Sequence, residues 1–241
     1  MGEQTYPENL NPTYKMQNDI NDIEDQIRTA TAIIKHGGMV VYPTETVYGL
    51  GADAFSEAAV RNVYKIKRRA ATQPISIAVS SFEMLHEVAD IDSEYVEIIA
   101  ELLPGPVTIL FKKKDIVPAI LTAASEVIGV RFPDNEIATR IIKETGPITA
   151  TSANVSGRNP PTCIEEVEVE LKLKVELGII INGGKCKYSM PSTVVDMSKA
   201  GATANEKGEI KIKRKGACYD RVLHVLRSKA VGEGLHRFSV P

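Results

Sequence analysis

Short aliphatic runs that are typical of buried strands alternate with longer segments of helical periodicity along most of this 241-residue chain. The run at residues 39–42 (MVVY), for example, follows an apolar helical pattern and precedes a helix that Ser56 would cap. Strands interleaved with helices imply a twisted, mixed sheet with helices packed against it. The sequence therefore predicts an α/β fold, a single domain with a twisted mixed β-sheet flanked by helices.

The same patterns define an ordered set of expected elements. Helices are expected over 20–34, 56–66, 82–88, 95–103, 136–144, 162–174 and 220–229, and strands over 39–42, 75–79, 107–111, 127–132, 148–151, 178–181, 193–195 and 209–212. Thr162, with Glu165 three residues later, forms a capping box for the sixth helix. Residues 1–18 read as an N-terminal extension, 19–216 as the folded domain, and 217–241 as a C-terminal helix and tail.

Composition and charge exclude several classes of protein. The chain has 29 Lys and Arg against 31 Asp and Glu, and this balance argues against a protein that coats nucleic acid through its overall charge. Cys163, Cys186 and Cys218 form no CxxC pair, so neither a disulfide framework nor a cysteine zinc site is indicated, and a reducing, cytoplasmic setting is expected. No apolar stretch is long enough to span a membrane, and the N-terminus lacks a signal-peptide core, so membrane insertion and secretion are not expected.

Three segments combine hydroxyls, cations or amides at the ends of expected elements, where α/β sheets place their ligands. They are residues 42–51 (YPTETVYGLG), 65–69 (KIKRR) and 149–158 (TATSANVSGR). The basic cluster would neutralise a polyphosphate, and the hydroxyl-rich segment could hold phosphate oxygens or a carboxylate. Each segment also has a structural explanation, as a capped turn, a solvated helix C-terminus or a polar loop.

Further candidates are Arg131 at the end of an expected strand, Ser192 after a proline, and Arg214 in a basic segment. Any one of them alone is more often structural than functional. Together, hydroxyl-rich strand ends and several arginines favour a site that binds anions. Scattered histidines without HxxxH spacing, and serines without a GxSxG elbow, disfavour a histidine metal site and a serine hydrolase.

Six ordered motifs resemble those of the YrdC-like threonylcarbamoyl-AMP synthases. The motifs are residues 43–51 (PTETVYGLG), 67–69 (KRR) with Pro74, 104–108 (PGPVT), 129–133 (GVRFP), 151–157 (TSANVSG) and 191–196 (PSTVVD). Longer relatives carry an additional C-terminal domain, whereas about 25 residues follow Gly216 here. The chain therefore resembles the stand-alone form of the family.

The resemblance implies a YrdC-like catalytic domain over residues 19–216 and a nucleotidyltransferase reaction. L-threonine, bicarbonate and ATP would give threonylcarbamoyl-AMP and pyrophosphate, for threonylcarbamoyladenosine modification of tRNA by a downstream transferase complex. A magnesium ion would accompany ATP as the cofactor. The resemblance names no protein residue as a ligand of that metal.

The resemblance also assigns roles to individual residues. Those facing threonine would be Thr46, Arg131, the main chain near Ala150, and Ser192; those binding the nucleotide would be Lys67, Arg69, Ser152, Asn154 and Arg214. Arg131 is a natural partner for the carboxylate of threonine. Lys67 and Arg69 would be catalytic, stabilising the negative charge that develops as pyrophosphate departs.

Three alternatives stay open on the sequence alone. The first is a carbamoyl-adenylate-forming relative, like the YrdC-like module of hydrogenase-maturation carbamoyltransferases, which carry cysteine pairs that this chain lacks. The second is a module that binds tRNA or other double-stranded RNA through residues 65–69, 112–114 and 211–215. The third is a sensor that binds threonine or nucleotide without turnover.

Overall fold

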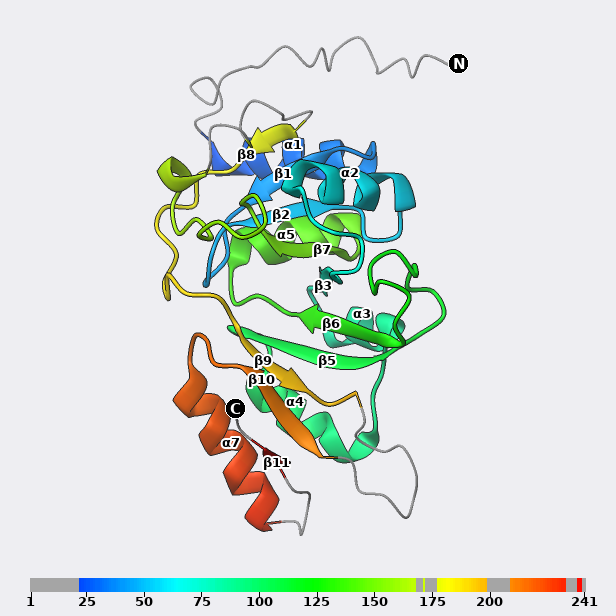
Figure 1. Ribbon diagram of the computed structural model, residues 1–241. Helices are drawn as coiled ribbons and strands as arrows, with labels where there is room; N and C mark the ends of the chain where they lie inside the picture. The colour runs from blue at the N-terminus through cyan, green and yellow to red at the C-terminus, as the bar shows by residue number, and fades with distance from the viewer. Residues whose placement is uncertain (1–21, 168–170, 172–176, 199–208, 233–237, 240–241) are drawn as a thin grey trace.

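The computed structural model describes residues 22–167, 171, 177–198, 209–232 and 238–239 (Figure 1). Its strands form one mixed sheet in the order β11-β10-β9-β5-β6-β3-β7-β2-β1-β8, and β4 pairs with β5 off this path. The strands are β1 (Met39–Tyr42), β2 (Gly49–Ala52), β3 (Ser76–Ala78), β4 (Ala89–Asp90), β5 (Val107–Lys113), β6 (Val127–Arg131), β7 (Ile148–Ser152), β8 (Leu177–Ile180), β9 (Thr193–Asp196), β10 (Ile210–Arg214) and β11 (Phe238–Ser239). Parallel and antiparallel pairs alternate irregularly along the sheet, so the predicted mixed α/β fold is confirmed.

Helices pack against both faces of this sheet. They are α1 (Ile23–Lys35), α2 (Glu57–Lys67), α3 (Phe82–Val88), α4 (Val96–Leu102), α5 (Glu136–Thr145) and α7 (Tyr219–Gly232), with 3₁₀ turns η1 (Ser93–Tyr95) and η2 (Ile164–Glu166). In β1, Val40 and Tyr42 join a core cluster with α1 and α5, while Met39 and Val41 join a larger cluster that includes α2. A strand buried on both faces explains why residues 39–42 form an uninterrupted apolar run.

Local side-chain bonds account for the helix starts that the sequence predicts. Ser56 caps α2 as expected, because its Oγ accepts a hydrogen bond from the Ala59 amide at 3.3 Å. Asp22 and Asn135 cap α1 and α5 in the same way. The C-cap of α2 is Arg68, which adopts a left-handed conformation at φ 49° and reverses the chain direction. That reversal positions part of the site described below.

Two local expectations differ from the structure. Residues 49–52 form the strand β2, which is not among the strands expected from the sequence. A Cβ on Gly49 would lie 2.7 Å from the Tyr42 ring, so only glycine lets β2 lie across that ring. The capping box also differs: the Thr162 amide and hydroxyl both bond to Glu166, not Glu165, and a 3₁₀ turn begins there. Most of the remaining expected helix, to residue 174, lies outside the described residues.

The C-terminal helix α7 belongs to the same core as the rest of the fold. It packs against α4, and Val222, Val225 and Leu226 are buried in the larger cluster. The N-terminal extension predicted for residues 1–18 lies outside the described residues. Within the described part of the chain, no helix is both long and apolar enough to traverse a bilayer.

Candidate active site

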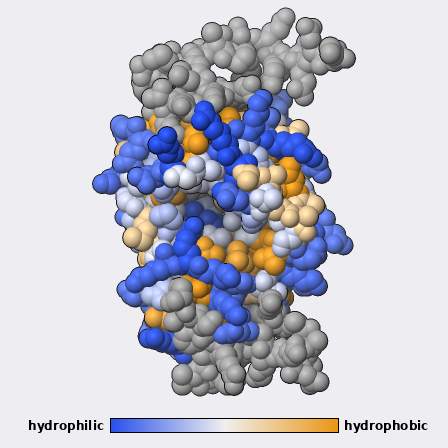
Figure 2. Space-filling view, in the orientation of Figure 1, coloured by the Kyte–Doolittle hydropathy of each residue, from blue (hydrophilic) through white to orange (hydrophobic). Residues whose placement is uncertain are grey.

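A cavity of about 370 Å³ opens across one face of the sheet, and eight of the strands contribute to its wall. Figure 2 shows the hollow near the middle of the molecule, with hydrophilic residues above it and to its left and a band of hydrophobic residues below it. Four arginines line it, at positions 69, 131, 158 and 214, whereas no Asp or Glu is among the described lining residues. A wall of this composition favours an anionic ligand.

One part of the cavity, which we call the arginine end, is lined by Thr108, Arg131, Ser192 and Arg214, with Glu45 buried behind Arg131. Arg131, at the end of β6, donates from Nη2 to Oε1 of Glu45 at 2.6 Å, and their side chains are 11% and 1% exposed. Glu45 Oε2 and Arg131 Nε are both buried without a partner among the described residues. The buried carboxylate thus holds one edge of the guanidinium in place and leaves other N–H groups free to face the cavity.

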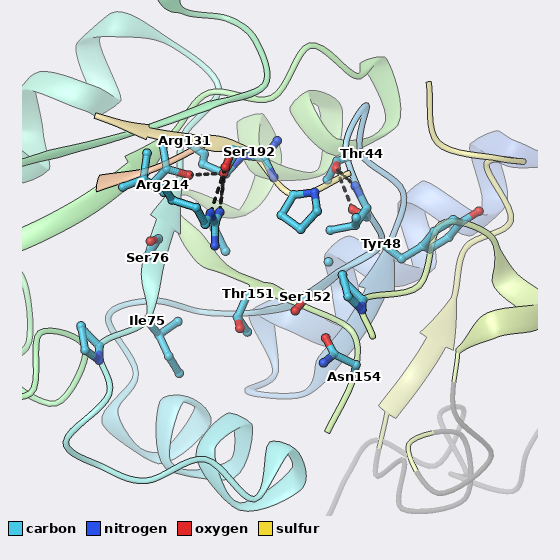
Figure 3. A pocket seen from close by; sticks show the side chains of 18 of the residues that line it. Thr44, Tyr48, Ile75, Ser76, Arg131, Thr151, Ser152, Asn154, Ser192 and Arg214 are labelled. Atoms are coloured by element: carbon cyan, nitrogen blue, oxygen red, sulfur yellow. Dashed lines mark hydrogen bonds between the residues drawn. The ribbon is translucent and has the colours of Figure 1, made fainter. Parts of the chain in front are cut away.

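Ser192 organises the other half of the arginine end (Figure 3). Its Oγ lies 2.7 Å from Oγ1 of Thr108, and Arg214 donates to Ser192 O at 3.1 and 2.9 Å and to Ser192 Oγ at 3.1 Å. Desolvation lowers the pKa of Arg214, and the nearby positive charge of Arg131 lowers it further. Of the two guanidiniums, Arg131 is paired with Glu45, whereas the bonds of Arg214 go to neutral oxygens of Ser192. The excess positive charge favours an anionic group near them.

The other part of the cavity, which we call the loop end, is lined by Arg69, Ser152 and Asn154, with Lys67 buried behind the loop. Lys67 is the last residue of α2 and is buried, whereas Arg69, which follows the left-handed Arg68, lines the cavity. Lys67 is 1% exposed, donates to Ser152 O, and donates to Asn154 O at 2.7 Å. Arg69 lines the cavity and is held by the carbonyls of Gln73 and Pro74 at 3.1 and 2.8 Å.

The loop after β7 is tied to α2 and to itself. The Ser156 amide donates to Lys67 O at 2.8 Å, so the Lys67 main chain and side chain both bind this loop. Asn154 Nδ2 donates to Val155 O at 2.9 Å and to Arg158 O at 2.8 Å. The loop end is therefore ordered by bonds from side chains to the main chain.

Most of the residues that the sequence predicts for the site line the cavity, but two do not. Those that line it are Arg69, Arg131, Ala150, Ser152, Asn154, Ser192 and Arg214. Lys67 lies behind the wall, on the carbonyls of Ser152 and Asn154. Thr46 is fully buried, and Thr44 lines the cavity in its place; the Thr46 amide donates to Thr44 Oγ1 at 3.1 Å. Arg214, predicted for the nucleotide, lies with Ser192 at the arginine end.

Several residues that shape the site are not among those predicted from the sequence. Thr44 and Thr108 line the cavity, and they belong to the motifs at 43–51 and 104–108. Their position inside these motifs could have indicated that they belong to the site. Glu45 lies in the first motif, but its pairing with Arg131 joins residues 86 apart. Tyr42 and Tyr48 also line the cavity, and burial raises the pKa of each phenol to about 12. Neither phenol is therefore an acid–base group near neutral pH.

Comparison with known proteins places this architecture in a family. The Sua5/YciO/YrdC family model, described as "Telomere recombination", matches residues 32–216. The chain belongs to this family. The match spans nearly all the described strands and both ends of the cavity, so the site lies within the part of the chain that defines the Sua5/YciO/YrdC family.

Individual relatives agree with the family assignment. The threonylcarbamoyl-AMP synthase of Pyrococcus abyssi is 39% identical over 178 residues, which cover 73% of this chain and 52% of that protein. A relative from Methanocaldococcus jannaschii is 40% identical over 187 residues, covering 77% of this chain and 86% of the relative. The solved structure of P. abyssi Sua5 complexed with L-threonine superposes with a TM-score of 0.76 at 34% identity, covering 90% of this chain and 59% of that one. The chain thus spans about half the length of the P. abyssi synthase.

Proposed function

We propose that this protein is an L-threonylcarbamoyladenylate synthase, a nucleotidyltransferase that forms threonylcarbamoyl-AMP and pyrophosphate from L-threonine, bicarbonate and ATP. The observation that carries the proposal is the arginine end, where Arg131 and Arg214 flank Ser192 in a cavity that no described carboxylate lines. The family membership and the threonine complex of the P. abyssi relative support the same reading.

In this proposal the arginine end holds threonine. The free N–H groups of Arg131 would form charge-assisted hydrogen bonds with the threonine carboxylate, while Glu45 fixes the guanidinium from behind. Ser192 and the main chain near Ala150 would contact the same substrate, and Thr46 would support the Thr44 hydroxyl that reaches the cavity. Threonine would then be presented with its amine directed toward the rest of the cavity.

The loop end would hold ATP, with the Ser152 hydroxyl and the guanidinium of Arg69 contacting phosphate oxygens. Lys67 would add positive charge from behind the wall and keep the 152–156 loop in position. Arg214, at the arginine end, would reach the phosphates from the threonine side. Magnesium bound with ATP would supply further charge neutralisation at the phosphates.

The proposed chemistry has two steps, and the site acts mainly by positioning and charge stabilisation. The threonine amine takes up bicarbonate, so that an N–C bond forms and water leaves, giving a carbamate. A carbamate oxygen then attacks the α-phosphorus of ATP; an O–P bond forms, the bond from the α-phosphorus to the bridging oxygen breaks, and pyrophosphate departs. Arg69 and Lys67 stabilise the developing negative charge, and neither acts as a base.

We further propose that a downstream tRNA threonylcarbamoyl transferase complex consumes the product in the cytoplasm. The three cysteines are all unpaired, which suits a reducing compartment. Direct binding to double-stranded RNA has weaker support, because two of the lysines that would serve it are paired with acids. Lys112 lies 3.9 Å from Asp90, and Lys211 lies 3.0 Å from Glu209.

The decisive experiment measures pyrophosphate release with ATP, magnesium and bicarbonate, with and without L-threonine, and identifies the adenylate by mass spectrometry. We expect release that requires both threonine and bicarbonate, together with threonylcarbamoyl-AMP. Binding of ATP and threonine without turnover would indicate a sensor. If the protein binds neither substrate but binds RNA in a salt-sensitive way, the RNA-binding alternative would be favoured over the synthase.

A further inference from the structure

At the loop end of the cavity, a polar side-chain atom is buried without a partner among the described residues. It is Oδ1 of Asn154, a residue that is 5% exposed and lines the cavity. Figure 3 shows the side chain extending from the loop after β7 with its oxygen directed toward Ser152 and the hollow. A buried acceptor without a donor is unfavourable, so this oxygen is expected to gain a partner when a ligand binds.

The orientation of this amide is determined by its surroundings. Both Nδ2 hydrogens are engaged, one by Val155 O at 2.9 Å and one by Arg158 O at 2.8 Å. Rotating the amide by half a turn would place its oxygen against two carbonyl oxygens, which cannot donate. Asn154 can therefore offer a ligand only an acceptor, and never a donor.

The acceptor Oδ1 of Asn154 lies among donor groups that suit a phosphate, and it would itself repel a phosphate oxygen unless a cation lay between them. The neighbouring cavity groups at this end, the Ser152 hydroxyl and the guanidiniums of Arg69 and Arg158, are donors suited to phosphate oxygens. A phosphate oxygen facing Asn154 Oδ1 would be repelled. A divalent cation between the two oxygens would convert that repulsion into attraction.

The rest of the cavity leaves few other oxygens for such a cation. No Asp or Glu is among the described lining residues, and the described residues contain no cluster of three His, Cys, Asp or Glu side chains. Mg²⁺ suits this setting because it keeps several of its waters and is held by substrate phosphates together with only one or two protein oxygens. The residues present therefore fit a metal that arrives with the nucleotide.

We propose that Oδ1 of Asn154 is the protein contact of the Mg²⁺ ion that accompanies ATP, made directly or through a water molecule on the metal. Lys67 supports this contact by holding the main-chain oxygens of Ser152 and Asn154. The inference rests on the proposed nucleotide site, and it adds the residue through which the protein recognises the metal.

The test compares the affinity for ATP with excess Mg²⁺ and with a chelator, by calorimetry and without threonine, so that no turnover occurs. For the unaltered protein we expect Mg²⁺ to tighten ATP binding by roughly tenfold, which corresponds to about 1.4 kcal/mol. Asn154→Ala should abolish most of this gain, while the affinity measured in chelator changes little. Ser152→Ala, a matched change on the same loop, should weaken binding by a similar factor in both conditions.

Two further measurements separate the metal contact from damage to the loop. Asn154→Asp should bind metal-free ATP more weakly, because a carboxylate repels phosphate, and should show a larger gain from Mg²⁺ than the unaltered protein. Any distortion of the loop lowers both affinities and cancels in their ratio. With Mn²⁺ in place of Mg²⁺, water-proton relaxation of the ATP complex should rise in Asn154→Ala if the contact is direct, and stay unchanged if a water lies between.

Two outcomes would overturn the inference. Equal weakening of ATP binding by Asn154→Ala with and without Mg²⁺ would mean that Oδ1 accepts from a ribose hydroxyl or the adenine amine. A gain from Mg²⁺ that persists in full in Asn154→Ala would place the protein contact elsewhere. Failure of the unaltered protein to bind ATP at all is distinguishable from both, because it would remove the proposed function itself.

Discussion

The two ends of the cavity are held together in different ways. At the arginine end, bonds between side chains predominate: Glu45 bonds to Arg131 and Thr108 to Ser192, while Arg214 donates to both the hydroxyl and the main-chain oxygen of Ser192. At the loop end, side chains bond to the main chain: Lys67 to the carbonyls of Ser152 and Asn154, and Arg69 to those of Gln73 and Pro74. A substitution at the arginine end is therefore expected to remove a bond to one neighbouring residue. A substitution at the loop end is expected to shift the main chain of the loop itself.

This difference suits the ligands proposed for each end. A small amino acid needs a few charged groups at defined positions, which paired side chains supply. A triphosphate needs donors along its length, and a loop that two elements hold in place can present several at once. The comparison predicts that variants of the arginine end affect threonine selectively, and that variants of the loop end affect stability together with ATP.

The largest effect is expected for Lys67→Met. The change leaves two carbonyl oxygens without their charged donor in the interior and should lower the free energy of unfolding by about 3 kcal/mol. ATP affinity should fall with it, and urea denaturation with calorimetry would measure both. Lys65→Met is the matched control, because Lys65 is exposed on the same helix and its loss should stay within about 0.5 kcal/mol. Equal free energies of unfolding for the two variants would contradict the claim that the bonds from Lys67 to the main chain stabilise the loop end.

Glu45→Gln should have the next largest effect, and a selective one. Removing the charge that holds Arg131 should raise KM for threonine roughly tenfold while leaving KM for ATP nearly unchanged. Steady-state kinetics with each substrate varied would show the split. Threoninamide, which lacks the carboxylate, should bind equally to both forms. Glu57→Gln, on the exposed surface of α2, is the control. An equal rise in both KM values would indicate general disruption of the site.

Thr108→Val should have a smaller effect at the same end. The hydroxyl that it removes makes a neutral hydrogen bond to Ser192 Oγ at 2.7 Å, and its loss should weaken threonine binding about fivefold. ATP binding measured alone should not change, and calorimetry with each ligand would test the difference. If ATP binding weakens as much as threonine binding, Ser192 serves both substrates and the two ends are not separate.

The smallest effect concerns Cys186, which lies close to Glu45 and Arg131. Burial raises the pKa of its thiol to about 11, so the reactive thiolate appears only as the pH rises toward that value. At pH 8 we expect iodoacetamide to leave Cys186 unmodified in the folded protein and to label it after denaturation, as read by peptide mass spectrometry. Rapid labelling at pH 8 in the folded state would contradict this expectation, because it would show that reagent and solvent reach the Cys186 thiol beside Glu45 and Arg131.

Local sequence was enough to predict most of the fold. Helical periodicity and the cap at Ser56 predicted α2, and a continuous apolar run predicted β1, because both signals arise within a few residues. The strand β2 was missed, since glycine disfavours strands in general and β2 depends on the close approach of Gly49 to the Tyr42 ring. That approach exists only once β1 and β2 have paired.

For the site, the sequence by itself determined several of the segments that line the cavity, because the motifs around Arg69, Asn154 and Ser192 are each contiguous. It also placed Lys67 and Arg69 at the end of one helix. Only the tertiary structure decided that Lys67 faces inward while Arg69 faces the cavity, and that Glu45 meets Arg131 across 86 residues. The physical reason is that burial and ion pairing depend on which surfaces meet when the sheet assembles, and no local pattern records that.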